Sequence, residues 1–218
     1  MKKNRTPQTD PSFLERFSRF GANCIAEFPA LHEMEQFPNN LWEQMIEKSL
    51  FGVTIDNEFG GQGQTLHSLT KAGMTLVEYG GNIGVAMSWL IHEMVARWLI
   101  FSFGTETQKK MYLPQLATGK KTACFAVLEP KVGAHPKHIK TSAKKVSAGF
   151  CLNGEKTYLT NGPIADLFIV IAITGQASGK NRFTAFIVHK EHLGLNGTEP
   201  YYFPFLWPPP QCGIHLKS

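Results

Sequence analysis

The chain has 218 residues, a hydrophobic fraction of 43%, a charged fraction of 18% and a formal net charge of +5 at neutral pH. This length allows one large domain or two small ones, with enough apolar material for a sizeable core. The basic residues are scattered apart from Lys2, Lys3 and Arg5 and the stretch from Lys137 to Lys145. Nucleic-acid binding needs a denser basic stripe with interleaved aromatic residues, so we expect no nucleic-acid partner.

The chain contains no apolar run of 18 residues, and its N-terminus is charged and then polar. We therefore expect no membrane span and no secretory signal. Cys24, Cys124, Cys151 and Cys212 lie far apart and form no Cys-x-x-Cys pair. This usage is typical of reduced, mostly buried thiols, and we expect a cytoplasmic protein.

Hydrophobic periodicity predicts helices throughout the first 120 residues or so. Phe13, Leu14, Phe17 and Phe20 follow one another at helical spacing, and similar patterns return further along the chain. Asn39 and Asn40 are candidate N-caps for a second helix. The expected helices cover residues 12–28, about 40–50, about 66–79, about 82–103 and 106–117.

Local signals refine the later helices. Thr65 or Ser68 is a candidate N-cap for the third helix, and Thr105 with Gln108 predicts a capping box at the start of the last one. The segment 82–103 is apolar on most faces, so we expect it at the buried centre of a helical bundle. Pro114 predicts a kink or an early end of the last helix.

The pattern changes to strands from Lys121 onward. Residues 122–128, 167–173 and 184–189 are short apolar or β-branched runs, and residues 214–217 could begin one more strand. Asn153-Gly154 predicts a hairpin turn between two short strands within residues 149–160. The segment 201–210 ends in three consecutive prolines and cannot be a central strand.

These patterns together predict an α+β protein with two domains. We expect an N-terminal all-α helical bundle over residues 1–120, followed by a β-barrel or β-sandwich domain over residues 121–218. Helices and strands that are segregated along the chain argue against an alternating α/β fold.

Two motifs suggest chemistry but fail on their context. Gly61-Gln62-Gly63 is the start of a dinucleotide fingerprint, yet no clear strand precedes it and the sixth position is Leu66. His92-Glu93 begins a zinc-protease motif, but position 96 is an alanine where the second histidine ligand would be. We therefore predict no metal site.

The strongest candidate site lies in residues 125–162. Two β segments end in turns there, one at Glu129-Pro130 and the other at Asn161-Gly162. Backbone N–H groups at such strand ends are natural donors to a ring with many acceptors, such as an isoalloxazine. Taken alone, the pattern is more typical of an ordinary sheet with ordinary turns.

Several longer segments resemble one known family. Residues 103–119, FGTETQKKMYLPQLATG, closely resemble the connector between the helical bundle and the barrel of acyl-CoA dehydrogenases. Residues 152–162, LNGEKTYLTNG, are similar to the flavin hairpin of the same family. Residues 51–55, 59–63, 184–188 and 194–195 also match in order, so the resemblance covers about residues 35 to 195.

The resemblance implies FAD as the cofactor and assigns residues to it. One side of the flavin and its phosphates would be lined within residues 125–134, and the other side by residues 158–160, with the hydroxyl of Thr160 near the flavin N5. The implied cofactor-binding residues are Phe125, Ala126, Val127, Leu128, Glu129, Ala134, Tyr158, Leu159 and Thr160.

The chain departs from the family pattern at five of these neighbouring positions. The family usually has Thr or Ser where this chain has Leu128, and a hydroxyl where it has Ala134. Lys131 stands in place of glycine, His135 in place of an acidic residue, and Tyr158 in place of tryptophan. Each lost hydrogen bond to a ligand costs about 0.5–1.5 kcal/mol, so several losses together weaken the expected FAD binding.

The resemblance implies α,β-dehydrogenation of an acyl-CoA thioester, with hydride transfer to flavin N5, in fatty acid metabolism. The family's catalytic base lies in a C-terminal helical domain, so no catalytic residue is assigned within this chain. The implied partners are an acyl-CoA substrate, an electron-transferring flavoprotein and a complementary chain that carries the C-terminal domain, within an oligomer. Alternatives are a non-catalytic binding module of the same fold, a truncated gene product, or a related flavin oxidase or monooxygenase.

Overall fold

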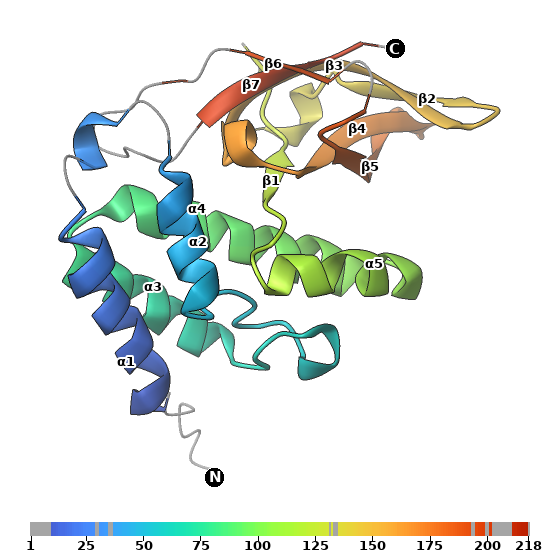
Figure 1. The fold of residues 1–218 in the computed structure, drawn as a ribbon. Coiled ribbons are helices and arrows are strands. Elements are labelled where there is room, and N and C mark those ends of the chain that lie inside the picture. Colours follow the sequence, from blue (N-terminus) through green and yellow to red (C-terminus); the bar gives the residue numbers. More distant parts are fainter. Residues whose placement is uncertain are drawn as a thin grey trace, which may run out of the picture. The chain divides into compact units, whose positions relative to one another are not determined.

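The computed structural model describes residues 10–28, 31–34, 37–130, 132, 135–192, 195–198, 201 and 211–217. The chain divides into two compact units, one helical up to Lys120 and one stranded from Lys121 onward (Figure 1). A helical unit followed by a curled sheet is the α+β architecture that the sequence predicts. We keep residues 1–120 and 121–218 as the proposed domain limits.

Among its described residues, the helical unit contains five α-helices together with short 3-10 and π-helical segments. Their bounds are α1 (Pro11–Phe20), η1 (Gly21–Ile25), η2 (Leu31–Glu33), α2 (Asn39–Glu47), η3 (Asn57–Phe59), α3 (Leu66–Gly80), α4 (Ile83–Met94), η4 (Val95–Phe101) and α5 (Glu106–Ala117).

Side-chain caps determine where several of these helices begin. Thr65 accepts a hydrogen bond from the Ser68 backbone amide at the start of α3. At α5 the Thr105 hydroxyl accepts from the Gln108 amide (3.2 Å), and the Gln108 side chain accepts from the Thr105 amide (2.9 Å). The predicted capping box is therefore confirmed, and it satisfies two amides that a helix start leaves without intrahelical partners.

Two expectations about helix ends are wrong. Asn39 is the first helical residue of α2 and not its cap; the cap position is Pro38, which offers no side-chain acceptor. Helix α5 continues through Pro114 to Ala117, so the early end at the proline is wrong, whereas the expected span of residues 106–117 is confirmed. Leu113 and Leu116 on either side of the proline are fully buried, and this burial offsets the hydrogen bond that proline cannot donate.

The apolar segment after Asn82 is only partly a core helix. Helix α4 continues directly into η4, as expected, and Trp89 is fully buried. However, Ile83 is 49% exposed and Trp98 is 45% exposed, so the expected buried position at the bundle centre holds for only part of the segment. Within the described residues this one helix, Ile83–Phe101, is long and apolar enough to cross a membrane. Just over half of it is buried inside the protein, which a helix in a bundle core also shows.

A buried carboxyl group ties the loop after α2 to α4. Glu93 is 2% exposed and accepts hydrogen bonds from the backbone amides of Gly52 (2.7 Å) and Val53 (2.9 Å). Burial raises the pKa of Glu93 to about 8, although the two amide hydrogen bonds act to lower it.

The loop that Glu93 holds requires glycine at position 52. Gly52 has a φ of 70°, and a Cβ there would lie 2.6 Å from the Ala117 carbonyl oxygen, so only glycine fits.

The stranded unit contains one curled sheet with the strand order β1-β4-β2-β3-β7-β6, while β5 pairs with β4. The pairs β1–β4 and β2–β4 are parallel, and the other pairs are antiparallel. The bounds are β1 (Ala123–Ala126), η5 (Pro136–His138), β2 (Ser142–Val146), β3 (Gly149–Thr160), η6 (Gly162–Ile164), β4 (Leu167–Ala177), β5 (Lys180–His189), β6 (Leu195–Gly197) and β7 (Gln211–Leu216).

The hairpin predicted at Asn153-Gly154 is wrong, because β3 runs through both residues without a turn. Gly154 is needed there for a close approach: a Cβ would lie 2.5 Å from the Thr141 hydroxyl oxygen. The hairpin turns lie at residues 147–148 and 178–179. At the second turn Ser178 and Gly179 have φ values of 50° and 72°, which is typical of a tight hairpin turn.

We predict that the stability of the chain falls as the pH rises from about 5 to about 8, because of Glu93. Its carboxyl has a folded pKa of about 8, above the ordinary value of 4.5. The folded state therefore binds more protons in this window, and the associated stability is present below about pH 4.5 and is lost as the pH rises through about 8. Thermal melts of wild type and Glu93→Gln across this range measure the effect, because glutamine cannot titrate.

The control for this experiment is Glu43→Gln, a change at an exposed carboxylate on α2. We expect its melting temperature to follow the wild-type pH profile, while the profile of Glu93→Gln is flatter. Parallel profiles for all three proteins would contradict the prediction.

Candidate functional site

The two segments singled out in the sequence lie side by side in the stranded unit. The backbone amide of Thr157 donates a hydrogen bond to the carbonyl of Leu128 (2.9 Å). The side-chain ammonium of Lys156 donates to the carbonyl of Val127 (3.0 Å). The chain that leaves β1 is thus joined to the second half of β3 at successive residues.

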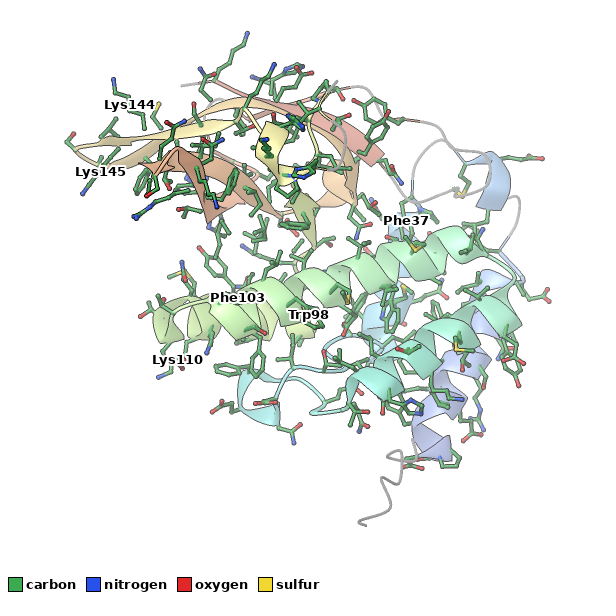
Figure 2. All side chains as sticks on the ribbon, turned by 180° about the vertical axis from the view of Figure 1, so that it is seen from behind. Phe37, Trp98, Phe103, Lys110, Lys144 and Lys145 are labelled. Atoms are coloured by element: carbon green, nitrogen blue, oxygen red, sulfur yellow. The ribbon has the colours of Figure 1, made fainter. Side chains whose placement is uncertain are left out.

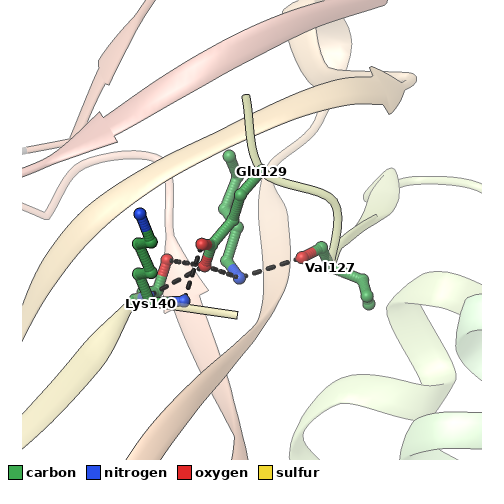
Figure 3. Close-up of polar contacts among 5 residues, drawn as sticks. Val127, Glu129 and Lys140 are labelled. Carbon is green, nitrogen blue, oxygen red and sulfur yellow. Dashed lines mark hydrogen bonds and ion pairs between the residues drawn. The ribbon is translucent and has the colours of Figure 1, made fainter. Parts of the chain in front are cut away.

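A buried ion pair adjoins this junction, because Lys156 bonds both to the Val127 carbonyl and to Glu129 (Figure 3). Lys156 Nζ is 2.9 Å from Glu129 Oε1, with Lys156 fully buried and Glu129 6% exposed. The Glu129 carboxylate also accepts from the backbone amides of Lys140 (2.7 Å) and Thr141 (2.8 Å), and from the Thr141 hydroxyl. Because both charges are paired and hydrogen-bonded, the pair can exist without water.

Two opposing effects determine the pKa of each partner. Burial acts to raise the pKa of Glu129, but the hydrogen bonds from Thr141, Lys156 and the two amides outweigh it and hold that pKa below its usual value. Burial lowers the pKa of Lys156, although Glu129 acts to raise it. At neutral pH Glu129 is therefore ionised, and its charge is compensated inside the sheet.

The predicted cofactor-binding residues differ in how exposed their side chains are. Phe125 and Tyr158 expose 39% and 54% of their surface, and the half-buried members are Val127, Leu128 and Thr160. The side chains of the buried members, Ala126, Glu129 and Leu159, face the interior of the unit. Ala134 lies outside the described residues, as does Lys131. Only the first five can therefore offer side chains to a ligand, while the three buried residues can offer only main-chain atoms.

A β-bulge turns Tyr158 outward. The pairing of β3 with β7 shifts between Lys156 and Leu159, and Tyr158 has a φ of 55°, which is unusual for an aromatic residue. Its ring lies 5.3 Å from the ring of Tyr201, whose hydroxyl accepts a hydrogen bond from the Thr157 hydroxyl (3.0 Å). Bulges of this kind occur next to binding sites, where they redirect a side chain.

Thr160 is the polar side chain best suited to a ligand. It is half-buried at the end of β3, and its hydroxyl has no hydrogen-bond partner within the part of the chain that the structure describes. The strand then turns at Asn161, which has a φ of 69° and is fully buried. A Cβ at Gly162 would lie 2.5 Å from Cys212 Sγ, so the turn is tightly packed against β7.

Lys156, Thr141 and Tyr201 were missed as parts of the site. Lys156 belongs to the resembling segment but was not assigned a role, because a lysine in a strand is usually read as solvent-exposed. Its partner Glu129 lies 27 residues earlier in the sequence, and no local pattern links the two.

No three His, Cys, Asp or Glu side chains gather as a metal-binding group in the part of the chain that the structure describes. Cys124 and Cys212 are buried, and burial raises the pKa of both thiols. Such thiols are poor nucleophiles. The chemistry available at this site is therefore binding by aromatic rings, a hydroxyl and main-chain groups.

Comparison with known proteins identifies the family. Residues 8–120 match the model of the acyl-CoA dehydrogenase N-terminal domain, and residues 124–202 match the model of the middle domain. The chain belongs to the acyl-CoA dehydrogenase family, which consists of flavoprotein oxidoreductases with FAD as their cofactor.

Individual relatives agree with this assignment. The chain is 32% identical over 199 residues to the mitochondrial isovaleryl-CoA dehydrogenase of Arabidopsis thaliana, covering 86% of this chain and 46% of that protein. Butyryl-CoA dehydrogenase from Megasphaera elsdenii has a similar structure (TM-score 0.87, 26% identity), covering 98% of this chain and 57% of the other. The FAD complex of PigA has a TM-score of 0.88 with 25% identity, covering 98% of this chain and 57% of the other. The chain spans about half the length of the relatives it matches.

The described residues fit the family's cofactor. An isoalloxazine ring needs flat apolar neighbours and hydrogen-bonding groups at its edge. Phe125 and Tyr158 are exposed aromatic residues, and Thr160 has a hydroxyl without a protein partner among the described residues. Leu128 is the poorest match, because its side chain cannot form a hydrogen bond.

We predict that Lys156→Met destabilises the stranded unit by about 3–5 kcal/mol, because it leaves the buried Glu129 charge unpaired. The double variant Glu129→Gln/Lys156→Met removes both charges and should lose less stability than Lys156→Met alone. Urea unfolding monitored by circular dichroism measures both free energies.

The control is Lys144→Met, a change at an exposed lysine of β2 for which no ion pair occurs among the described residues. We expect it to change stability by less than about 0.5 kcal/mol. Equal losses for Lys156→Met and Lys144→Met would show that the ion pair is unimportant.

Proposed function

We propose that this chain forms the FAD-holding part of an acyl-CoA dehydrogenase, with residues 125–129 and 158–160 as the flavin-binding segments. The observation that carries the proposal is the hydrogen bond between Leu128 and Thr157, which places the first segment next to the outward-turned Tyr158. Family membership supports the cofactor, and the exposed groups described above support the location. Ala134 remains in the proposed set because of the resemblance alone.

Each exposed group has a defined role in this proposal. Phe125 and Tyr158 offer apolar ring surfaces, and Thr160 donates or accepts one hydrogen bond. The buried Ala126, Glu129 and Leu159 contribute through their main chains. FAD supplies the hydride acceptor when it is bound.

In this proposal the catalytic base comes from outside these 218 residues. Removing a proton from the α-carbon of a thioester needs a positioned base. Glu93 and Glu129, the buried carboxyl groups of the described residues, are held by backbone amides. We therefore propose that a helical domain equivalent to the unmatched half of the relatives supplies the base, as a complementary chain.

The helical unit offers a surface for such a domain. An apolar groove of about 540 Å³ lies between α3 and α4, lined mainly by Leu69, Met74, Val77, Ile83, Met87 and Leu90. Large apolar side chains are also exposed further along, including Trp98 and Phe103 (Figure 2). We assign the groove and these exposed side chains to the complementary helical domain, because exposed apolar side chains are buried when a partner binds them.

The remaining partners follow from the same proposal. The substrate is an acyl-CoA thioester in fatty acid metabolism, and an electron-transferring flavoprotein accepts the electrons. The working form is an oligomer. A cytoplasmic location is supported by the cysteines, which are all free thiols.

One observation favours a second candidate, a binding module that keeps the fold without the cofactor. Leu128 is half-buried at the junction and presents an apolar side chain where the resemblance leads us to expect a hydroxyl. In that case the exposed rings of Phe125 and Tyr158 would contact a protein partner instead of a flavin.

We predict that the purified chain retains FAD after desalting, and that Leu128→Thr binds it more tightly than Leu128→Val. Threonine and valine have the same shape, so their difference isolates the hydroxyl, which should contribute about 0.5–1.5 kcal/mol. Quenching of flavin fluorescence measures the dissociation constants. A colourless wild type, with no binding by either variant, would support the binding module.

We also predict that the 218 residues alone do not oxidise acyl-CoA thioesters. Without a positioned base, an added substrate should leave the absorbance of bound flavin unchanged under anaerobic conditions. Chemical reduction of the same sample with dithionite is the control, because it bleaches any accessible flavin. Bleaching by butyryl-CoA or palmitoyl-CoA would show that a base exists within these residues.

A further inference from the structure

We propose that the buried Glu129–Lys156 pair is a positioning device for the cofactor site, although neither side chain would touch the cofactor. This inference rests on the proposed function, because it concerns the same two segments. It assigns Glu129 a different role from the one expected from the sequence: its carboxylate acts on the protein backbone and not on the ligand.

The pair joins three stretches of chain that are distant in the sequence. Lys156 Nζ bonds to the Val127 carbonyl (3.0 Å) and to Glu129 Oε1 (2.9 Å). The Glu129 carboxylate also accepts hydrogen bonds from the backbone amides of Lys140 (2.7 Å) and Thr141 (2.8 Å). Residues 127–129, residues 140–141 and the middle of β3 therefore meet at one carboxylate and one ammonium group.

Because Lys156 and Glu129 are both buried, the geometry of their hydrogen bonds can change little without loss of stability. No water can replace a lost partner at side chains that are 0% and 6% exposed, and an unsatisfied buried charge is costly. A buried ion pair adds little to stability compared with an apolar pair of the same volume. Its distinctive effect is directional, because each hydrogen bond fixes a distance and an angle between backbone segments.

The strained bulge follows directly after Lys156. Tyr158 has a φ of 55°, which is unfavourable for a residue with a bulky side chain, so the neighbouring structure must hold it. Lys156 and Thr157 hold the bulge on one side through Val127 and Leu128. On the other side Leu159 is fully buried in the core. The pair thus helps to set the position at which Tyr158 and Thr160 are presented.

The test shortens the side chain of each of the two buried glutamates, Glu129 and Glu93, by one methylene group. Glu129→Asp keeps the charge but moves the carboxylate away from Lys156 and the two amides. Glu93→Asp is the matched control. Glu93 is also a buried carboxyl group that accepts hydrogen bonds from two backbone amides, but it belongs to the helical unit. FAD affinity is measured by fluorescence quenching at a temperature at which circular dichroism shows every variant to be folded.

We expect Glu129→Asp to weaken FAD binding by about tenfold or more, equivalent to losing one or two hydrogen bonds in the site. It should also alter the resolved shoulders of the bound-flavin absorption band, which report on the surroundings of the ring. Glu93→Asp should lose stability but keep its affinity within about twofold, because additivity holds between independent sites. If Glu129→Asp does not fold, Lys156→Arg replaces it, since arginine keeps the charge with a different donor geometry.

The outcomes separate this inference from the proposed function. A wild type that binds no FAD overturns the proposed function and, with it, this inference. A wild type that binds FAD, together with a folded Glu129→Asp of equal affinity and spectrum, overturns the positioning role alone. Equal weakening by Glu93→Asp and Glu129→Asp also overturns it, because the effect would then reflect general destabilisation.

Discussion

The arrangement of the stranded unit depends on one buried ion pair. Glu129 and Lys156 are 27 residues apart in the sequence and form an ion pair. The carboxylate also accepts hydrogen bonds from two amides and a hydroxyl, and the ammonium group donates one to a carbonyl. Removing either charge leaves the other uncompensated in a low-dielectric interior. The end of β1 and the bulge of β3 consequently keep a fixed relation to each other.

Part of this structure could be predicted from local patterns. Thr105 and Gln108 formed the predicted capping box, because a helix start is satisfied by residues three positions apart. The strand over residues 167–173 was also expected, because a β-branched run favours a buried strand. Such signals need only neighbours in the sequence, and the family resemblance added the order of the two domains.

Other features could not be predicted, because they depend on contacts between distant residues. Asn153-Gly154 has the composition of a hairpin turn, but the close approach of Thr141 to Gly154 requires an extended strand. The positive φ of Tyr158 is imposed by the bulge against β7 and has no signal of its own. Of the nine predicted site residues, Ala126 and Leu159 are buried in the core. For Leu159, a period of two could not reveal this burial, because the bulge of β3 interrupts the alternation of side chains.

The two units make different contributions in the proposed enzyme. The stranded unit would hold the cofactor through Phe125, Tyr158 and Thr160, while the helical unit offers an apolar face formed by α3 and α4. Its own buried carboxyl, Glu93, fixes a loop and is not free to act as a base. In the proposed enzyme, cofactor binding and proton abstraction are therefore assigned to separate domains.

The most direct test of this account is amide chemical-shift mapping by NMR as FAD is added to the chain. The account predicts that the resonances of residues 125–129 and 157–160 shift together, with the largest changes around Tyr158 and Thr160. Shifts confined to other residues, or a spectrum that FAD leaves unchanged, would contradict it.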